Sequence, residues 1–179
     1  MKQIIKECKR CSLFKKRITP TIHCGDIKSN ILFIGEAPGK NEDETGIPFC
    51  GRAGSILNDL LKLIELKRED VYITNIVKCR PPKNRDPKKS EIKKCSYLLE
   101  KEIELLKPKI ICPLGRFSSK YILNKYFKKN YEIGEVHGKV FKTENIIIIP
   151  MYHPAAAIYN NKKINILKKD FKKIKKYDV

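Results

Sequence analysis

Tryptophan is absent from this chain, and tyrosine and phenylalanine contribute only 8 and 7 of its 179 residues. Acidic residues are also few, since 20 Asp and Glu stand against 39 Lys and Arg, which gives a net charge of +19. No apolar run approaches the roughly 18 residues of a membrane span, and no signal-peptide pattern follows Met1. We therefore expect a cytoplasmic protein with no membrane partner.

The large positive charge indicates a polyanionic partner, with nucleic acid first and an anionic lipid surface second. A generally lysine-rich composition is the alternative, and it would need no partner. Eight lysines fall in residues 162–179, where Ile164, Leu167 and Phe171 recur at helical spacing. This spacing predicts a basic C-terminal helix with one face docked on the protein and the other in solvent.

Short apolar runs without polar alternation predict strands that are buried on both faces, as in a parallel sheet. They cover residues 31–35, 71–77, 109–114 and 146–151. Helical patterns cover residues 55–66, 90–106 (with Ser90 as N-cap) and 117–127. Strands that alternate with helices predict an α/β fold, a three-layer α/β/α sandwich with a central, mostly parallel four-stranded sheet. We expect one domain over residues 1–179.

The seven cysteines are odd in number, so complete internal pairing is impossible. In a reducing compartment, clustered cysteines more often hold a metal than form disulfides. Cys8 and Cys11 form a Cys-x2-Cys pair, and Cys79 and Cys95 are separated by fifteen residues. Two such pairs can supply four thiolates to zinc or to an iron–sulfur cluster. Cys112 lies in an apolar run and is expected in the core, whereas Cys24 and Cys50 lie in loops and remain possible ligands.

Three polar residues lie near the carboxyl ends of predicted parallel strands: Glu36, Asn75 and His153. These ends meet at one edge of a sheet, which is where open α/β sheets bind ligands. The glycine-rich turn after the first strand resembles a phosphate-binding loop only superficially. Three residues, rather than the four of a P-loop, separate Gly35 from Gly39, and no Ser or Thr follows Lys40. Both features argue against a nucleoside triphosphatase.

Other residues near this edge suit the recognition of a flat ligand beside phosphates. Phe49 lies among glycines in residues 46–54 and can stack on such a ligand, although a core position is the alternative. Asn75 within an apolar strand needs partners, and its amide can read one donor and one acceptor. The following loop is stiffened by proline and basic, as expected of a segment near phosphates. Its candidate DNA-binding residues are Lys78, Arg80, Lys83 and Arg85.

Several long motifs, in order, resemble the family 4 uracil-DNA glycosylases, the iron–sulfur branch of that superfamily. They are GEAPGKNEDETGIPFCGRAG, TNIVKCRPPKNRDP, ICPLG and MYHPA, within a resemblance that runs from Cys8 to about Tyr159. The resemblance implies a monofunctional DNA glycosylase that acts in base excision repair. Such an enzyme flips uracil out of single- or double-stranded DNA and hydrolyses its N-glycosidic bond, leaving an abasic site. We expect it to act as a monomer.

The resemblance also implies a 4Fe–4S cofactor and assigns its ligands to residues of this chain. Residues 1–24 form the N-terminal cluster-binding segment, and the role of the cluster is structural, since it orders loops beside DNA. The implied ligands are Cys8, Cys11, Cys79 and Cys95.

For the base pocket, the resemblance implies that Phe49 stacks on the flipped uracil and that Asn75 hydrogen-bonds its polar edge. His153 would donate to uracil O2, where negative charge develops as the base departs. The turn that begins at Glu36 would line the pocket together with Ala37 and Pro38. The region after His153 would enter the minor groove, with Ile158 or Tyr159 filling the vacated stack.

The resemblance does not assign the residue that handles water, because Ala37 stands where family 1 enzymes carry an aspartate. Glu42 is our candidate for positioning water or balancing the sugar cation, with Asn84 as a hydrogen-bond partner. A solvated acid without a role is the equal alternative for Glu42. No lysine stands at a Schiff-base position, so the abasic site should remain uncleaved.

The alternative function is a non-catalytic nucleic-acid-binding module of the same fold with a four-cysteine metal site. A binding module does not need Glu36, Asn75 and His153 at those positions. The joint presence of the three residues therefore favours the enzyme.

Overall fold

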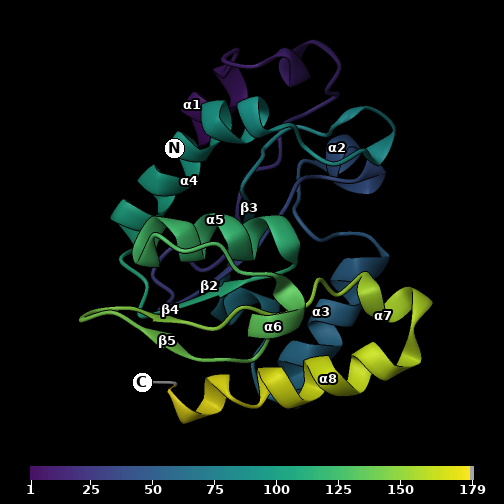
Figure 1. The fold of residues 1–179 in the computed structure, drawn as a ribbon. Helices are drawn as coiled ribbons and strands as arrows, with labels where there is room; N and C mark the ends of the chain where they lie inside the picture. Colours follow the sequence, from purple (N-terminus) through teal and green to yellow (C-terminus); the bar gives the residue numbers. More distant parts are fainter. Residues whose placement is uncertain (178–179) are drawn as a thin grey trace.

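Figure 1 shows the fold of a computed structural model, which describes residues 1–177 of the chain. Six strands form one mixed sheet in the order β1-β3-β2-β4-β6-β5. The four central strands are parallel, and the outer pair, β1 and β5, run antiparallel to their neighbours. The strands are β1 Cys24–Gly25, β2 Ile31–Gly35, β3 Tyr72–Asn75, β4 Ile110–Pro113, β5 Phe141–Lys142 and β6 Ile147–Ile148. The predicted parallel four-stranded centre is confirmed, with two short edge strands added to it.

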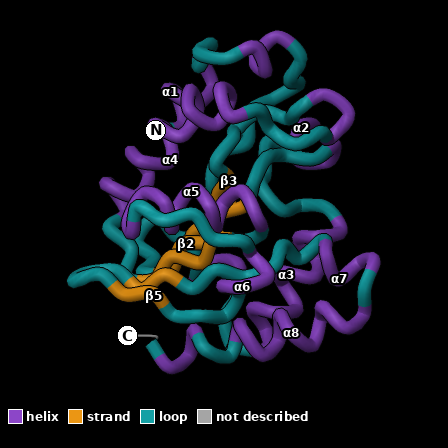
Figure 2. The backbone as a smooth tube through the Cα atoms, in the orientation of Figure 1, coloured by secondary structure: helices purple, strands orange, loops and turns teal. Residues whose placement is uncertain are grey.

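Helices cover both faces of this sheet (Figure 2). The α-helices are α1 Lys2–Glu7, α2 Lys40–Thr45, α3 Arg52–Leu63, α4 Lys89–Leu106, α5 Arg116–Phe127, α6 Ile133–Val136, α7 Ala156–Tyr159 and α8 Asn161–Phe171. The short 3-10 helices are η1 Ser12–Lys15, η2 Arg68–Asp70, η3 Pro82–Asn84 and η4 Ile174–Lys176. Among the described residues, no helix combines the length and apolar character needed to span a membrane.

Alternate residues of β2 divide the core into two layers, and all of them are buried. Ile31 and Phe33 pack with α3 and α8, where the rings of Phe33 and Phe171 stack with their centroids 5.6 Å apart. Leu32 and Ile34 pack on the opposite face with α4 and α5. A strand without polar alternation is buried in this way because helices cover both of its sides. The three-layer α/β/α prediction is therefore confirmed.

The N-terminal segment joins the layer that contains α4, and Ile5 and Leu13 are buried there. Two hydrogen bonds also fasten the chain to α2. The Ile18 N–H donates to the Asp43 carboxylate at 3.2 Å, and the Thr19 N–H donates to the Asp43 carbonyl at 3.0 Å. Hydrophobic contact and hydrogen bonding thus hold residues before β1 against the α/β domain.

The last predicted strand and the C-terminal helix are shorter than the patterns indicated. β6 comprises two residues because the ladder with β4 is interrupted at Ile149. The Ile149 N–H donates to the Ile111 carbonyl at 3.0 Å, but Pro113 of β4 has no N–H to donate to the Ile149 carbonyl, and pairing resumes only where Met151 bridges to Leu114. α8 ends at Phe171, and η4 follows it, so the predicted helix over 162–179 is broken. Residues 178–179 of that prediction lie outside the described part of the chain.

Two predicted helix starts are also corrected. The N-cap of α4 is Lys88 rather than Ser90, because the Glu91 carboxylate accepts the Lys88 N–H at 2.8 Å and closes the first turn. The helix predicted over residues 55–66 also begins earlier, since α3 starts at Arg52 with Gly51 as its N-cap.

Candidate active site

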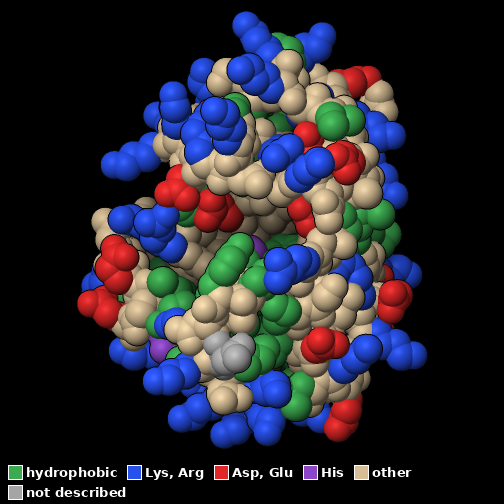
Figure 3. Space-filling view, turned by 90° about the vertical axis from the view of Figure 1, so that its right-hand side faces the viewer, with side chains coloured by type: hydrophobic (Ala, Val, Ile, Leu, Met, Phe, Trp, Pro, Cys, Tyr) green, Lys and Arg blue, Asp and Glu red, His purple; other side chains and the backbone are tan. Residues whose placement is uncertain are grey.

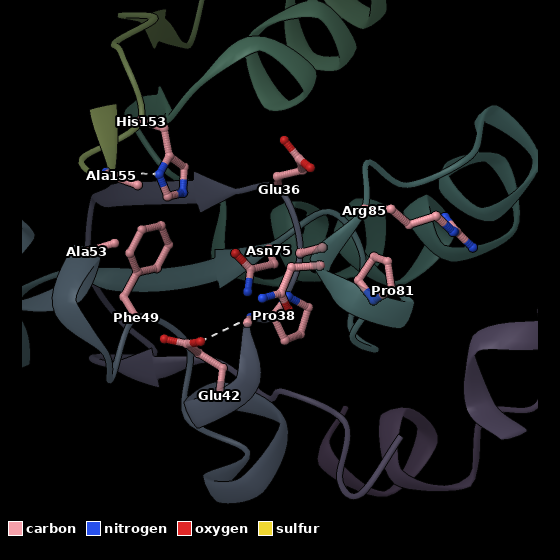
Figure 4. A pocket seen from close by; sticks show the side chains of 13 residues that line it. Glu36, Pro38, Glu42, Phe49, Ala53, Asn75, Pro81, Arg85, His153 and Ala155 are labelled. Atoms are coloured by element: carbon pink, nitrogen blue, oxygen red, sulfur yellow. Dashed lines mark hydrogen bonds between the residues drawn. The ribbon is translucent and has the colours of Figure 1, made fainter. Parts of the chain in front are cut away.

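A cavity of about 340 Å³ opens at the carboxyl edge of the parallel strands, and Figure 4 shows its lining. It collects residues from segments far apart in the sequence, as predicted from the strand ends. The predicted residues that line it are Glu36, Ala37, Pro38, Glu42, Phe49, Asn75, Arg85 and His153. In the space-filling view, Figure 3, a hollow has acidic side chains at its rim and Lys and Arg side chains spread around it.

Asn75 ends β3 opposite Gly35 of β2, and its side chain is 2% exposed. Its amide nitrogen Nδ2 is buried and has no hydrogen-bond partner in the structure. A buried donor without a partner is costly, so the amide is suited to a ligand that accepts a hydrogen bond. A Cβ at Gly35 would lie 2.2 Å from Asn75 Oδ1, which shows that the amide occupies space left free by glycine.

Phe49 is held in an uncommon backbone conformation beside Asn75. Its φ is 54°, a left-handed value that non-glycine residues rarely adopt. A Cβ at Gly54 would lie 1.7 Å from the Phe49 carbonyl oxygen, so only glycine permits this approach of α3. The Phe49 ring is nearly parallel to that of His153, with an interplanar angle of 23° and centroids 5.4 Å apart. Backbone constraints thus place an aromatic face at the cavity.

His153 lies in the segment between β6 and α7, and the local backbone determines its tautomer. The Ala155 N–H donates to His153 Nδ1 at 3.2 Å, so this nitrogen is an acceptor and the neutral ring carries its proton on Nε2. Burial lowers the pKa of His153 to about 4, and the Glu42 carboxylate opposes this effect only in part. His153 is therefore a neutral Nε2–H donor near pH 7. The sequence motif identified His153 as a site residue, but it did not indicate that the Ala155 N–H would fix the tautomer of the ring.

The two acids of the cavity differ in their surroundings. The Glu42 carboxylate accepts the N–H groups of Gly39 and Gly51, each at 3.0 Å. Burial, followed by the nearby Asp86 carboxylate, raises the pKa of Glu36 to about 7. Glu42 is thus fixed by two backbone donors, whereas Glu36 can change its charge near neutral pH.

The predicted pairing of Glu42 with Asn84 is wrong. Asn84 Oδ1 instead accepts the Arg80 Nε–H at 2.7 Å, within the same loop. Asn84 does line the cavity, but its side-chain oxygen is occupied by the guanidinium. The Arg80 side chain is therefore tied to the loop that carries it.

The four basic candidates for DNA contact fall into different environments. Lys83 is exposed, and Arg80 is partly exposed on the same loop. Arg85 lines the cavity and pairs with the Glu91 carboxylate, donating from Nη1 at 2.9 Å and from Nη2 at 2.7 Å. Assigning Lys78 to DNA is wrong, since this residue is 1% exposed and its ammonium pairs with Glu102. Contact with DNA therefore stays a prediction for Arg80, Lys83 and Arg85.

Beyond the pocket, one large side chain is unusually exposed. Tyr159, at the end of α7, is 87% exposed, whereas Ile158 beside it is partly buried. Of the two wedge candidates, Tyr159 therefore has the side chain that is free to meet a partner.

A second, smaller cavity brings together the four predicted metal ligands, Cys8, Cys11, Cys79 and Cys95. Burial raises the pKa of the Cys95 thiol to about 12 and also raises that of Cys79. Arg17 borders the cavity, donating to the Cys8 carbonyl at 3.1 Å and to Cys79 Sγ at 3.2 Å. Its role was not apparent from the sequence, because many basic residues surround the first cysteine pair.

The chemistry of this donor set fits a metal centre, since four thiols from two distant segments line one cavity. None of the four cysteines forms a disulfide, and within residues 1–177 no three His, Cys, Asp or Glu side chains already form a group that could hold a metal ion. Cys24, Cys50 and Cys112 do not line this cavity. Cys112 is fully buried in β4, as predicted, and Cys24 belongs to β1 rather than to a loop.

The fold is that of a known protein superfamily. A model described as the uracil DNA glycosylase superfamily matches residues 22–177, and the chain belongs to that superfamily. The chain is also 46% identical to the type-4 uracil-DNA glycosylase of Sulfurisphaera tokodaii, over 98% of this chain and 82% of the relative. The corresponding enzyme of Saccharolobus solfataricus is 48% identical over 96% of this chain and 82% of its own length. Within the superfamily, the chain therefore belongs to the type-4 uracil-DNA glycosylases, which confirms the resemblance in its motifs.

The environment of His153 leads to a prediction about its titration. The imidazole resonances, assigned with His153→Ala, should show a midpoint near pH 4 for His153, below the ordinary value of 6.5. Because the folded pKa is the lower one, the stability gained from the neutral ring should be present above pH 6.5 and lost as pH falls toward 4. An NMR titration that places the midpoint near 6.5 would contradict the assigned environment.

Proposed function

We propose that this protein excises uracil from DNA by hydrolysing the N-glycosidic bond, leaving an abasic site for later repair steps. One observation carries the proposal: Asn75, Phe49 and His153 converge on one cavity in a chain of the type-4 family. DNA, single- or double-stranded, is then the substrate, and the site of action is inside the cell, where DNA lies. We also propose that residues 1–177 act as one glycosylase domain, with 1–24 as its cluster-binding segment.

The base would be recognised outside the DNA stack, since its glycosidic bond and edges are otherwise inaccessible. Phe49 supplies an aromatic face, and Asn75 supplies one donor and one acceptor. Uracil presents a carbonyl and an adjacent N–H, which complement the two ends of a fixed amide. Cytosine presents an amine and a ring nitrogen without hydrogen. Its amine, a donor, would then face the Asn75 amide N–H, and its ring nitrogen, an acceptor, would face the Asn75 amide oxygen, so neither hydrogen bond would form. This complementarity supports uracil as the base that is accepted.

The chemistry requires stabilisation of two developing charges. As the bond breaks, the sugar becomes positive and the departing uracil becomes negative at its O2 oxygen. The neutral His153 Nε2–H would donate to that oxygen, and a donor is most effective where charge grows in the transition state. The Glu42 carboxylate, held by the Gly39 and Gly51 amides, would face the cationic sugar or position the attacking water. Glu36, Ala37 and Pro38 would complete the wall of the pocket.

DNA outside the pocket would meet the loop that carries Arg80, Lys83 and Arg85. Their phosphate contacts would be salt-sensitive and independent of sequence. The exposed Tyr159 is well placed on α7 to fill the stack from which uracil has departed. The C-terminal lysines would add non-specific attraction to DNA during the search.

The thiols of Cys8, Cys11, Cys79 and Cys95 would hold a 4Fe–4S cluster. Bound there, the cluster would supply a structural cross-link between the N-terminal segment and the segments around β3 and α4. The protein's own contribution is to bury Cys79 and Cys95, to half-bury Cys8 and Cys11, and to place the Arg17 guanidinium beside Cys79.

Removing His153, the proposed donor, or Asn75, which would recognise the base, should lower activity far more than shortening the aromatic side chain of Phe49. We expect His153→Ala and Asn75→Ala to lower the rate of uracil release by about 10² to 10³, and Phe49→Leu to lower it much less. The assay uses a single-stranded oligonucleotide with one uracil, alkali cleavage of abasic sites, and a gel. Asn145→Ala, in the exposed β5–β6 turn, is the matched control and should retain the wild-type rate.

Two outcomes of this assay would overturn parts of the proposal. Cluster-loaded wild-type protein that binds the oligonucleotide but releases no uracil would reject the enzyme and favour a non-catalytic binding module. Equal rates in the His153, Asn75 and Phe49 variants would reject the roles assigned to these residues.

The cofactor proposal predicts visible absorption from iron–sulfur charge transfer in protein purified without oxygen. Cys95→Ser should lose this absorption and unfold at a lower temperature, because one of four ligands is removed. Cys50→Ser changes an exposed cysteine outside the four-cysteine cavity and should retain both properties. A colourless wild-type protein that contains zinc, or undiminished absorption in Cys95→Ser, would contradict the proposed cluster.

A further inference from the structure

Lys78 and Glu102 form an ion pair that is closed off from solvent. Lys78 Nζ lies 2.6 Å from Glu102 Oε2, and the two side chains are 1% and 0% exposed. A buried ion pair is weak evidence for stability, because desolvating both charges offsets much of their attraction. Lys78 itself lines the four-cysteine cavity, and its ammonium contacts Asn75, which lines the active-site cavity.

All three protons of the Lys78 ammonium have acceptors. They are Thr74 Oγ1 at 2.6 Å, Glu102 Oε2 at 2.6 Å and the backbone carbonyl of Asn75 at 2.9 Å. Glu102 also accepts hydrogen bonds from the Thr74 hydroxyl, at 3.3 Å to Oε1 and 3.2 Å to Oε2. The direction of the ammonium is therefore determined by several groups at once, and one of these is the peptide of Asn75.

The backbone of Lys78 is anchored on the opposite side, toward the cysteines. Its N–H donates to Cys95 Sγ at 3.3 Å, and its carbonyl accepts the Thr21 N–H at 2.7 Å and the Thr21 hydroxyl at 3.2 Å. Cys79 is the next residue in the chain. One residue thus contacts the four-cysteine cavity through its main chain and Asn75 through its side chain.

We propose that Lys78, oriented by Glu102, is a positioning residue that sets the Asn75 peptide and hence the side-chain amide facing the base. This inference rests on the proposed uracil excision. Asn75 Nδ2 has no partner that would orient it, so its direction depends on the backbone from which it projects. The Lys78 hydrogen bond to the Asn75 carbonyl supplies that constraint.

Two apolar residues of similar volume would fill the same space and leave no unpaired charge. The double substitution Lys78→Met with Glu102→Leu therefore separates packing from positioning. We expect it to keep the visible absorption and an unfolding midpoint near that of the wild type. Its kcat for uracil release should fall about 10²-fold, as for a misplaced reacting group. KM should change much less, and cytosine release relative to uracil release should rise.

The matched control is Lys125→Met with Glu100→Leu, which removes a partly exposed Lys–Glu pair between α5 and the same helix α4 that carries Glu102. It should retain the wild-type kcat, KM and preference for uracil. If the first double variant does not fold, Glu102→Gln keeps the side-chain shape while removing the charge that orients Lys78. Glu102→Gln should then show the same two changes, a lower kcat and weaker discrimination against cytosine.

Wild-type kcat and wild-type discrimination in the folded double variant, or in Glu102→Gln, would overturn the positioning role. Equal losses in the Lys125/Glu100 control would also overturn it, since any Lys–Glu pair would then have the same effect. A wild-type protein that releases no uracil would instead reject the proposed function. The two failures are therefore distinguishable within one set of assays.

Discussion

The parallel register of β2 against β3 is the constraint on which the site depends, because it sets Gly35 opposite Asn75. Without a side chain at Gly35, the Asn75 amide and the edge of the Phe49 ring approach the same point. The hydrophobic faces of β2, buried on both sides, hold that register, since a slip by one residue would rearrange the core contacts. Asn75, which is proposed to recognise the base, is thus positioned by the packing of the sheet rather than by a flexible loop.

Charge has separate roles outside and inside the protein. The excess of Lys and Arg suits attraction to DNA, whereas the three groups of the pocket proposed to meet the base are a neutral imidazole, an amide and an aromatic ring. Neutral groups at the base favour selectivity, since their hydrogen bonds depend on the pattern of donors and acceptors rather than on charge alone. Lys78 shows that a cation can also act from within, where its Glu102 partner and three acceptors fix its direction.

The sequence predicted the features that depend on local pattern, and it failed where partners are distant. Uninterrupted apolar runs predicted the parallel centre of the sheet, and the strand ends predicted the convergence of Asn75 and His153. Lys78 resembled a surface cation because its partner, Glu102, lies 24 residues away on another element. The tautomer of His153 depends on the backbone N–H of Ala155, and because every residue except proline has such a group, the sequence does not single it out. The shortened last strand follows from Pro113 of the neighbouring strand β4, which has no N–H for the Ile149 carbonyl, and the sequence does not show which carbonyl faces that proline.

The central claim, that the glycine opposite Asn75 allows the amide to read uracil, is tested most directly by Gly35→Ala. The new Cβ would lie 2.2 Å from Asn75 Oδ1 and 2.6 Å from the Phe49 ring, so the amide must move. The measurement is the single-turnover rate of uracil release, with Gly134→Ala as control because a Cβ there meets nothing closer than 3.9 Å. The account predicts a loss of about 10²-fold in folded, cluster-loaded Gly35→Ala, as misplaced groups typically cause. A wild-type rate in that variant would contradict it.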